Sequence, residues 1–137
     1  MTRTFSAIVA VAALSAPAIA ADVEAGEKEF NKCKSCHMIV ADDGTEIVKG
    51  GKTGPNLYGI VGRTAGTMDF RYGDDLVAAG EAGLVWDEAN LAEYMQDPRA
   101  YLRTYLDDNG AKSKMTFKLR TGAEDVAAYL ASVGGES

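Results

Sequence analysis

The sequence has few of the side chains that hold metals or form crosslinks: its 137 residues include one histidine and two cysteines. A zinc site of cysteine and histidine needs about four such ligands, so this chain cannot form one. Basic residues are also fewer than acidic ones, with 14 Lys and Arg against 20 Asp and Glu and a net charge of −6. This acidic balance argues against non-specific nucleic-acid binding. Beyond the N-terminal region, no segment is apolar enough to span a membrane, which takes about 20 apolar residues.

The few possible ligands are gathered in one place. Both cysteines and the only histidine lie in the pentad Cys33-Lys34-Ser35-Cys36-His37. This Cys-x-x-Cys-His spacing is the one that attaches a c-type haem, in which two thiols add to the vinyl groups and the imidazole ligates the iron. Residues three apart share one face of a helical turn, so both sulfurs can reach one porphyrin edge. The pentad predicts one covalently attached haem c, held by Cys33 and Cys36, with His37 as a metal ligand.

A Cys-x-x-Cys pair is also typical of thiol oxidoreductases. That interpretation predicts strands around the pair, whereas the flanks here are typical of a helix before it and a loop after it, and it leaves His37 without a role. A disulfide across two intervening residues closes a very small loop and would stabilise little. Haem attachment therefore explains the pentad better than either alternative.

Residues 1–20 have the pattern of a secretory signal peptide. Arg3 is positive, residues 5–14 are apolar and rich in alanine, and Ala18-Ile19-Ala20 is an A-x-A cleavage site. The apolar stretch is short for a membrane span, although an uncleaved anchor is the alternative. We therefore expect residues 1–20 to be removed and residues 21–137 to form one soluble, exported domain.

The remaining pattern predicts an all-α domain of short helices and long loops. We expect helices over residues 23–33, over 87–96 with Asp87 as N-cap, and over 98–106 with Pro98 at the first position. Thr121-Gly122-Ala123-Glu124 has the pattern of a capping box, so a last helix should begin at Thr121. Residues 38–85 are rich in glycine and predict loops with no strand. So long a loop suits a compact domain only if it wraps a large group such as haem.

The second axial position of the iron has no histidine left to fill it, so methionine is the leading candidate. Met115 lies just before the last predicted helix, and Met68 lies in the glycine-rich region. Met38 is too close to His37 to reach the opposite face, and Met95 has a core-like position in a predicted helix. The chemistry alone favours Met115 and leaves Met68 or an open position as alternatives.

Three segments together resemble a known family. They are the pentad, the run Lys52-Thr53-Gly54-Pro55-Asn56-Leu57-Tyr58-Gly59, and Lys114-Met115-Thr116-Phe117. They resemble class I cytochromes c, and most of all the bacterial cytochrome c2 subfamily, over essentially the whole chain after residue 20. The resemblance implies the class I cytochrome c fold, with a few short helices and long loops around one haem c, and it makes Met115 the second axial ligand.

The same resemblance implies roles for residues around the haem. Pro55 should present its backbone carbonyl to the His37 ring N–H, which fixes the imidazole orientation. Tyr94 should lie near the methionine sulfur and Phe117 at the exposed haem edge. The haem propionates should be held by Arg63, Tyr72, Trp86 and Ser113. Gly26, Phe30 and Tyr129 should pack the first helix against the last.

Axial ligation by His37 and Met115 closes both faces of the iron and raises its reduction potential. We therefore expect an electron carrier, not an enzyme, that moves single electrons in the periplasm. The resemblance implies membrane redox complexes as partners: a cytochrome bc1 type donor, and a reaction centre, oxidase or reductase as acceptor. A haem-based gas sensor is the alternative from another class, and it would need a displaceable sixth ligand.

Lysines flank both segments that carry the iron ligands, and acidic residues dominate elsewhere. Such a distribution would steer the exposed haem edge onto an acidic docking site. We expect the carrier to be a monomer that touches the membrane surface only transiently. The lysines expected to ring the haem edge are Lys32, Lys34, Lys52, Lys112, Lys114 and Lys118.

Overall fold

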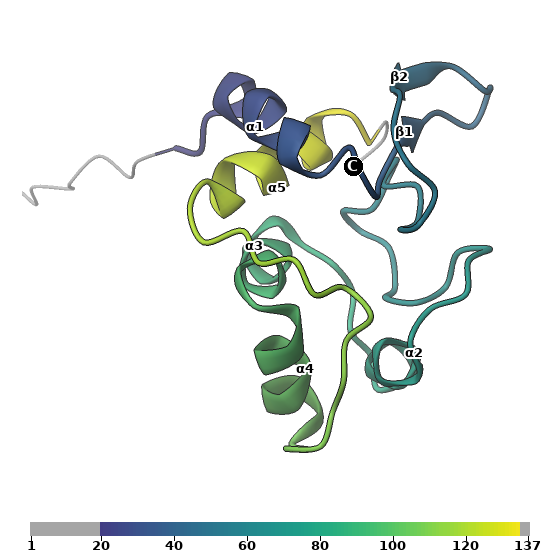
Figure 1. Ribbon diagram of the computed structural model, residues 1–137, viewed down its shortest axis with the longest axis vertical. Helices are drawn as coiled ribbons and strands as arrows, with labels where there is room; N and C mark the ends of the chain where they lie inside the picture. The colour runs from purple at the N-terminus through teal and green to yellow at the C-terminus, as the bar shows by residue number, and fades with distance from the viewer. Residues whose placement is uncertain (1–19, 135–137) are drawn as a thin grey trace, which may run out of the picture.

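The computed structural model describes residues 20–134, so the predicted signal peptide, except for its last residue Ala20, lies outside the described part. The described residues form five α-helices, a 3₁₀ turn and one small hairpin, and Figure 1 shows how they are arranged. Among residues 20–134, no helix has the length and apolar character needed to cross a membrane. The elements are α1 (Val23–Glu29), the 3₁₀ turn η1 (Phe30–Lys32), β1 (Ile39–Val40), β2 (Glu46–Val48), α2 (Asp74–Glu81), α3 (Glu88–Gln96), α4 (Pro98–Leu106) and α5 (Ala123–Ser132).

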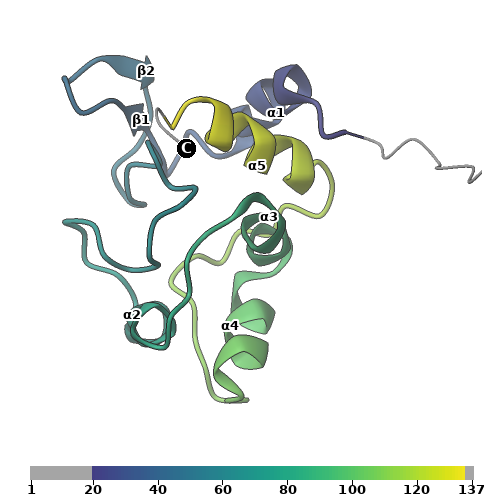
Figure 2. The ribbon, with the colours of Figure 1, turned by 180° about the vertical axis from the view of Figure 1, so that it is seen from behind.

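The first and last helices pack against each other, as expected from the sequence (Figures 1 and 2). Gly26 permits the close approach, because a Cβ at this position would overlap the backbone carbonyl of Asp125 on α5. The rings of Phe30 and Tyr129 lie 5.8 Å apart between centroids, a favourable separation for a tilted aromatic pair. This contact joins the two ends of the described chain and places the Cys33–His37 segment at the end of η1.

Helices α3 and α4 begin where the sequence predicts. The Asp87 carboxylate accepts the N–H of Asn90 at 2.7 Å, and the Asn90 side chain accepts the N–H of Asp87 at 2.8 Å, which is a reciprocal capping box. Asp97 caps α4 through the N–H of Ala100 at 3.0 Å, and Pro98 occupies the first turn. The short break between the helices lets α3 and α4 run in different directions (Figure 1).

Two predictions of local structure are wrong. The capping box at Thr121 does not form, because Gly122 adopts a left-handed conformation with φ of 80° and the helix begins only at Ala123. Residues 38–85 are not all loop either, since they contain the antiparallel β1–β2 hairpin and helix α2. Helix α2 is hard to predict from the sequence because it includes Gly80, and glycine is unfavourable in a helix. A Cβ at Gly80 would overlap the carbonyl of Ala65, so the glycine is a packing requirement.

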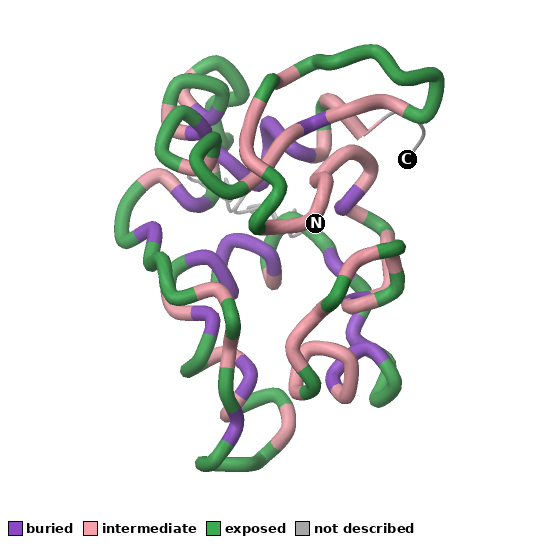
Figure 3. Tube along the Cα trace, turned by 45° about the vertical axis from the view of Figure 1, so that its right-hand side comes forward, coloured by how far each residue is buried: buried purple, intermediate pink, exposed green. Residues whose placement is uncertain are grey.

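The long segment between β2 and α2 forms one side of the molecule (Figures 1 and 2). Residues 54–66 are mostly half-buried, and Figure 3 shows the buried, half-buried and exposed stretches along the whole described trace. The segment between α4 and α5 runs past α2 on its way back to the top of the molecule (Figure 1). Together with α3 and the end of η1, these segments surround the site described next.

Candidate haem site

A cavity of about 570 Å³ lies between the loops and helices, within the size range of ligand-binding pockets. Its walls are mainly apolar, with contributions from Phe30, Leu57, Ile60, Leu76, Leu91, Met95, Val126 and Leu130. Every residue that the sequence assigns to haem attachment, iron ligation or haem contact also lines it. These residues are Cys33, Cys36, His37, Pro55, Arg63, Tyr72, Trp86, Tyr94, Ser113 and Met115.

The pentad forms a helical turn at the wall of the cavity. The carbonyl of Cys33 accepts the N–H of Cys36 at 3.2 Å and the N–H of His37 at 2.9 Å. This turn places residues three and four apart on one side, as the attachment chemistry requires. Both thiols are free of disulfide bonds. Burial and the nearby Glu29 carboxylate raise the pKa of Cys33 to about 11, so its thiol is protonated near neutral pH.

His37 is oriented by the loop that follows the hairpin. Its Nδ1 lies 2.8 Å from the carbonyl oxygen of Pro55, to which it donates as an N–H. Nε2 is therefore the ring nitrogen left for a metal. Burial lowers the pKa of His37, and the bond to Pro55 opposes that shift only in part. The imidazole is thus held in the neutral form that can ligate iron.

Two methionines of residues 20–134 line the cavity, and two do not. Met115 reaches it from the segment between α4 and α5, and Met95 reaches it from α3. Met38 and Met68 are absent from its walls, so the alternative of Met68 as the sixth ligand receives no support. Met95 is 6% exposed within the main core cluster, whereas Met115 is half-buried at the edge of that cluster.

The half-buried Arg63 has one guanidinium nitrogen without a hydrogen-bond partner among the described residues. Nη1 of Arg63 is buried without a hydrogen bond, while Nη2 donates to the carbonyl of Tyr58. Burial lowers the pKa of Arg63 and raises that of Tyr72, and each group partly offsets the shift of the other. A buried N–H without an acceptor is unfavourable, so the cavity is suited to a ligand that brings a carboxylate to Nη1 of Arg63. The propionates of a haem meet this requirement, and the residues present fit the group.

Ser113 and Tyr94 line the cavity close to Met115. The Ser113 hydroxyl donates to the Met115 carbonyl at 2.9 Å. Because a hydroxyl has one hydrogen, the bond to a propionate that the resemblance implies would require this hydroxyl to turn. Burial raises the pKa of Tyr94, and a hydrogen bond with Ser113 opposes the shift. The rings of Tyr94 and Trp86 pack at 4.9 Å between centroids.

The six predicted docking lysines do not lie together around the cavity. Lys32, Lys112 and Lys114 line it, while Lys34, Lys52 and Lys118 do not. Two of the six are paired within the chain: Lys32 with Glu29 at 2.9 Å, and Lys118 with Asp97 at 3.1 Å. Phe117, which is 43% exposed, also lines the cavity. The positive charge at the cavity edge therefore comes from these three lysines and from the exposed Arg71, which also lines the cavity.

Asn56 has a structural role that sequence reasoning missed. Its side chain accepts the N–H of Val40 at 3.0 Å and donates to the carbonyl of Val40 at 2.8 Å. It also accepts the N–H of Tyr58 at 3.1 Å. These bonds tie the loop that carries Pro55 to the β1 strand. The sequence did contain a signal for this role, because Asn56 directly follows Pro55 in the run 52–59 that resembles the cytochrome c family.

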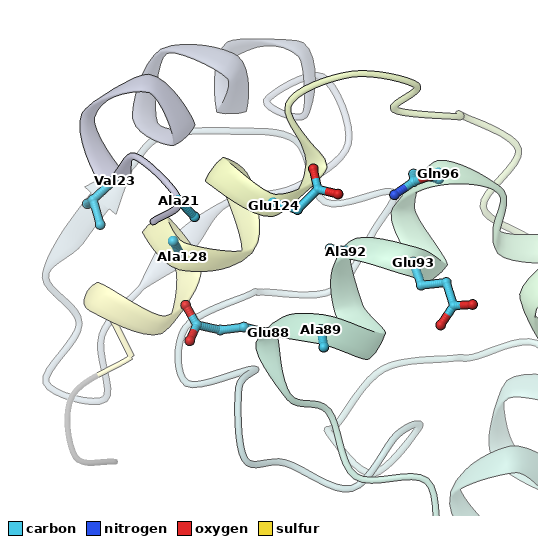
Figure 4. A pocket seen from close by; sticks show the side chains of 9 residues that line it. All are labelled: Ala21, Val23, Glu88, Ala89, Ala92, Glu93, Gln96, Glu124 and Ala128. Atoms are coloured by element: carbon cyan, nitrogen blue, oxygen red, sulfur yellow. The ribbon is translucent and has the colours of Figure 1, made fainter. Parts of the chain in front are cut away.

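A second hollow lies between the start of α1 and helices α3 and α5, and Figure 4 shows its lining. Its floor consists of small side chains and its rim carries Glu88, Glu93 and Glu124. None of the residues predicted to contact haem lines it. This hollow therefore has no part in the haem site.

The cavity unites a Cys-x-x-Cys-His turn, an oriented imidazole, a methionine from a distant segment and a half-buried arginine with a free N–H donor that suits an anion. With a fold of short helices and loops around it, this combination defines a class I cytochrome c.

Comparisons with known proteins extend this conclusion. The chain is 70% identical over 138 residues to cytochrome c-551 of Roseobacter denitrificans, which covers 100% of this chain and 99% of that protein. It is 62% identical to cytochrome c2 of Rhodobacter capsulatus, over 93% of this chain and 94% of the relative. The chain belongs to the cytochrome c2 family. No family model matches the chain.

Solved structures agree with this assignment. The structure of cytochrome c2 from Rhodobacter capsulatus matches with a TM-score of 0.81 and 64% identity, over 82% of this chain and 97% of that one. The structure of cytochrome c2 from Paracoccus denitrificans matches with a TM-score of 0.83 and 52% identity, over 85% and 99%. The predicted class I cytochrome c fold is confirmed, and with it a covalently attached haem c and a place in electron transport.

Proposed function

We propose that this protein is a soluble periplasmic carrier that moves single electrons between membrane redox complexes. The observation that carries the proposal is that His37 and Met115, from segments far apart in the sequence, line one cavity. His37 and Met115 would hold the iron of a bound haem as its two side-chain ligands, which would leave no position for a substrate. The signal pattern of residues 1–20 supports export, with residues 21–137 as the mature domain.

The bound haem c supplies an iron that gains or loses one electron. Cys33 and Cys36 would hold it through thioether bonds, and Pro55 would keep His37 oriented for ligation through Nε2. A thioether ligand such as Met115 and a largely apolar cavity both disfavour the more highly charged ferric form, which raises the reduction potential. Arg63 would pair with a propionate that would otherwise carry a partly buried charge without a partner.

Lysines at the cavity edge would guide the haem edge to its partners. Lys32, Lys112 and Lys114 lie there, on a chain whose net charge is −6. A positive edge on an acidic protein favours an approach in one orientation to an acidic docking site. The partners proposed are a cytochrome bc1 type donor and, as acceptor, a reaction centre, an oxidase or a reductase.

The test is electron transfer with a purified cytochrome bc1 complex and a reaction centre over a series of salt concentrations. The second-order rate constant should fall steeply as ionic strength rises, because exposed charges are screened. Lys114→Glu should slow the reaction more than the control Lys28→Glu, since Lys28 lies on α1 outside the cavity lining. A flat salt response with equal effects of both variants would contradict the proposed docking edge.

A second measurement separates the carrier from a gas sensor. Carbon monoxide should not bind readily to the ferrous holoprotein, because Met115 would occupy the sixth position. An equilibrium redox titration should give a midpoint potential above zero. Ready binding of carbon monoxide, with a potential well below zero, would contradict the carrier and favour the sensor.

A further inference from the structure

We infer that Asp75 is a positioning residue that fastens the Met115 segment to helix α2 and so limits how readily Met115 leaves the iron. Oδ2 of Asp75 accepts the backbone N–H of Lys112 at 2.7 Å, across 37 positions of sequence. The inference rests on the proposed ligation of iron by Met115. It concerns the stability of that bond rather than the identity of the ligand.

The segment that carries Met115 has few other backbone ties. It lies between α4 and α5, outside any helix or strand. Within residues 112–118, Lys112 is the one residue whose backbone N–H has a hydrogen-bond partner in the described chain. The next backbone bond to another element is from the N–H of Leu119 to the carbonyl of Met95. On the other side of Met115 the backbone is held by the Asp75 carboxylate at 2.7 Å and, one residue earlier, by a longer bond of 3.4 Å from Nε of Arg99 to the carbonyl of Ala111.

Side-chain contacts around Asp75 strengthen the same junction. Nζ of Lys114 lies 3.3 Å from the carbonyl of Arg71, and its aliphatic chain passes beside Gly73. All three residues before Met115 therefore make hydrogen bonds that hold the segment. Lys112 and Lys114 bond to residues at and just before the start of α2, and Ser113 bonds to Met115 itself. Figures 1 and 2 show the segment running alongside α2.

Helix α2 is a firm support for such an anchor. Gly80 lies against the backbone of Ala65 so closely that no side chain would fit, and Leu76 lines the cavity. Asp75 also lies in the first turn of α2, where the helix dipole favours a negative charge. A charged acceptor makes a stronger hydrogen bond to an N–H than a neutral one does. The contact is therefore suited to resist displacement of the Met115 segment.

The chain offers a matched control one residue away. Asp74 carries the same charge in the same helical turn, but it is exposed and has no hydrogen bond to the Met115 segment. Asp74→Ala and Asp75→Ala therefore remove equal charge from equivalent positions of the helix dipole. Only the second removes the acceptor of the Lys112 N–H. Asp75→Asn retains an oxygen that can accept this bond and tests for rescue.

The experiment is an imidazole titration of the ferric holoprotein, followed by the Soret band and by the weak far-red band of methionine-ligated ferric haem. Imidazole can bind only when Met115 has left the iron. Asp75→Ala should bind imidazole about fivefold more tightly than the wild type, which corresponds to about 1 kcal/mol. Asp74→Ala should remain within about 1.5-fold, and Asp75→Asn should fall between the two alanine variants. Equal affinities in the two alanine variants would overturn the inference.

Amide hydrogen exchange of the wild-type holoprotein gives a second test that does not depend on any variant folding. The Lys112 amide should exchange more slowly than the amides of residues 113–118, because it alone is bonded. Equal exchange would overturn the inference. Failure of the proposed ligation would look different: the far-red band would be missing from the wild type, whatever the variants do.

Discussion

Nδ1 of His37 lies 2.8 Å from the carbonyl oxygen of Pro55, and a Cβ on the neighbouring Gly54 would come within 2.7 Å of the same nitrogen. One short loop therefore sets the imidazole in two ways. It provides the acceptor that fixes the ring, and it leaves out the side chain that would displace the ring. The position of the ring therefore depends both on the Pro55 carbonyl and on the absence of a side chain at Gly54.

Replacement of Gly54 by alanine should disturb this arrangement. The added methyl group would push the ring or the loop aside, and overpacking of this kind costs about 1–3 kcal/mol. Denaturant unfolding of the holoprotein should show this loss, and the NMR signal of the His37 Nδ1 proton should shift. Gly110→Ala is the control, because its Cβ would meet only the Asp108 side chain. Equal stability of the two variants would contradict the crowding at His37.

Met115→Leu should remove the sixth ligand while preserving volume. The far-red band of the ferric protein should disappear, and the midpoint potential should fall by on the order of 0.1 V, because thioether ligation raises it. Met95→Leu is the matched control, since Met95 also lines the cavity but belongs to the buried core. The control should keep both the band and the potential. If the band disappeared in the Met95 variant alone, Met95 would be the ligand.

Arg63→Gln should leave a haem propionate without its partner. Nη1 of Arg63 is buried beside the cavity and has no hydrogen bond to any residue of the described range 20–134. Loss of a charged hydrogen bond of this kind should lower the free energy of unfolding of the holoprotein by about 1–3 kcal/mol. Arg120→Gln, at an exposed position before α5, should change it little. Similar unfolding curves for the two variants would show that Arg63 makes no such pair.

The site could be predicted from the sequence because scarcity and spacing limited the choices. A single histidine beside two cysteines left one attachment site, and the family resemblance added the other residues expected near the haem, several of them outside the segments 52–59 and 114–117 that carry it. All ten residues predicted to contact the haem line one cavity. The lysine ring was less predictable. Sequence position near a ligand segment does not show which way a long side chain extends, and Lys118 turns to Asp97 instead.

The secondary structure was predictable where local signals determine it, and not where distant contacts do. Asp87, Asp97 and Pro98 act within their own helical turns, so α3 and α4 were found with the correct ends. Helix α2 was missed because Gly80 is unfavourable in a helix. The glycine is required there by close packing against the backbone of Ala65, which lies outside the helix. The start of α5 was misplaced because Gly122 adopts a left-handed conformation. Glycine allows both left-handed and right-handed conformations, so its presence alone does not show which one is adopted.

Tyr94→Phe should make the protein less sensitive to alkaline pH. Burial raises the pKa of Tyr94 above its ordinary value of about 10, so the unfolded chain loses this proton first as the pH rises. The contribution of Tyr94 to stability is therefore complete below about pH 10 and is lost as the pH rises towards the folded-state pKa. Denaturant unfolding across this window should show a shallower decline for Tyr94→Phe than for the wild type. Tyr105→Phe, on the exposed face of α4, is the control and should follow the wild type. A decline in Tyr94→Phe as steep as in the wild type would mean that another group governs the alkaline transition.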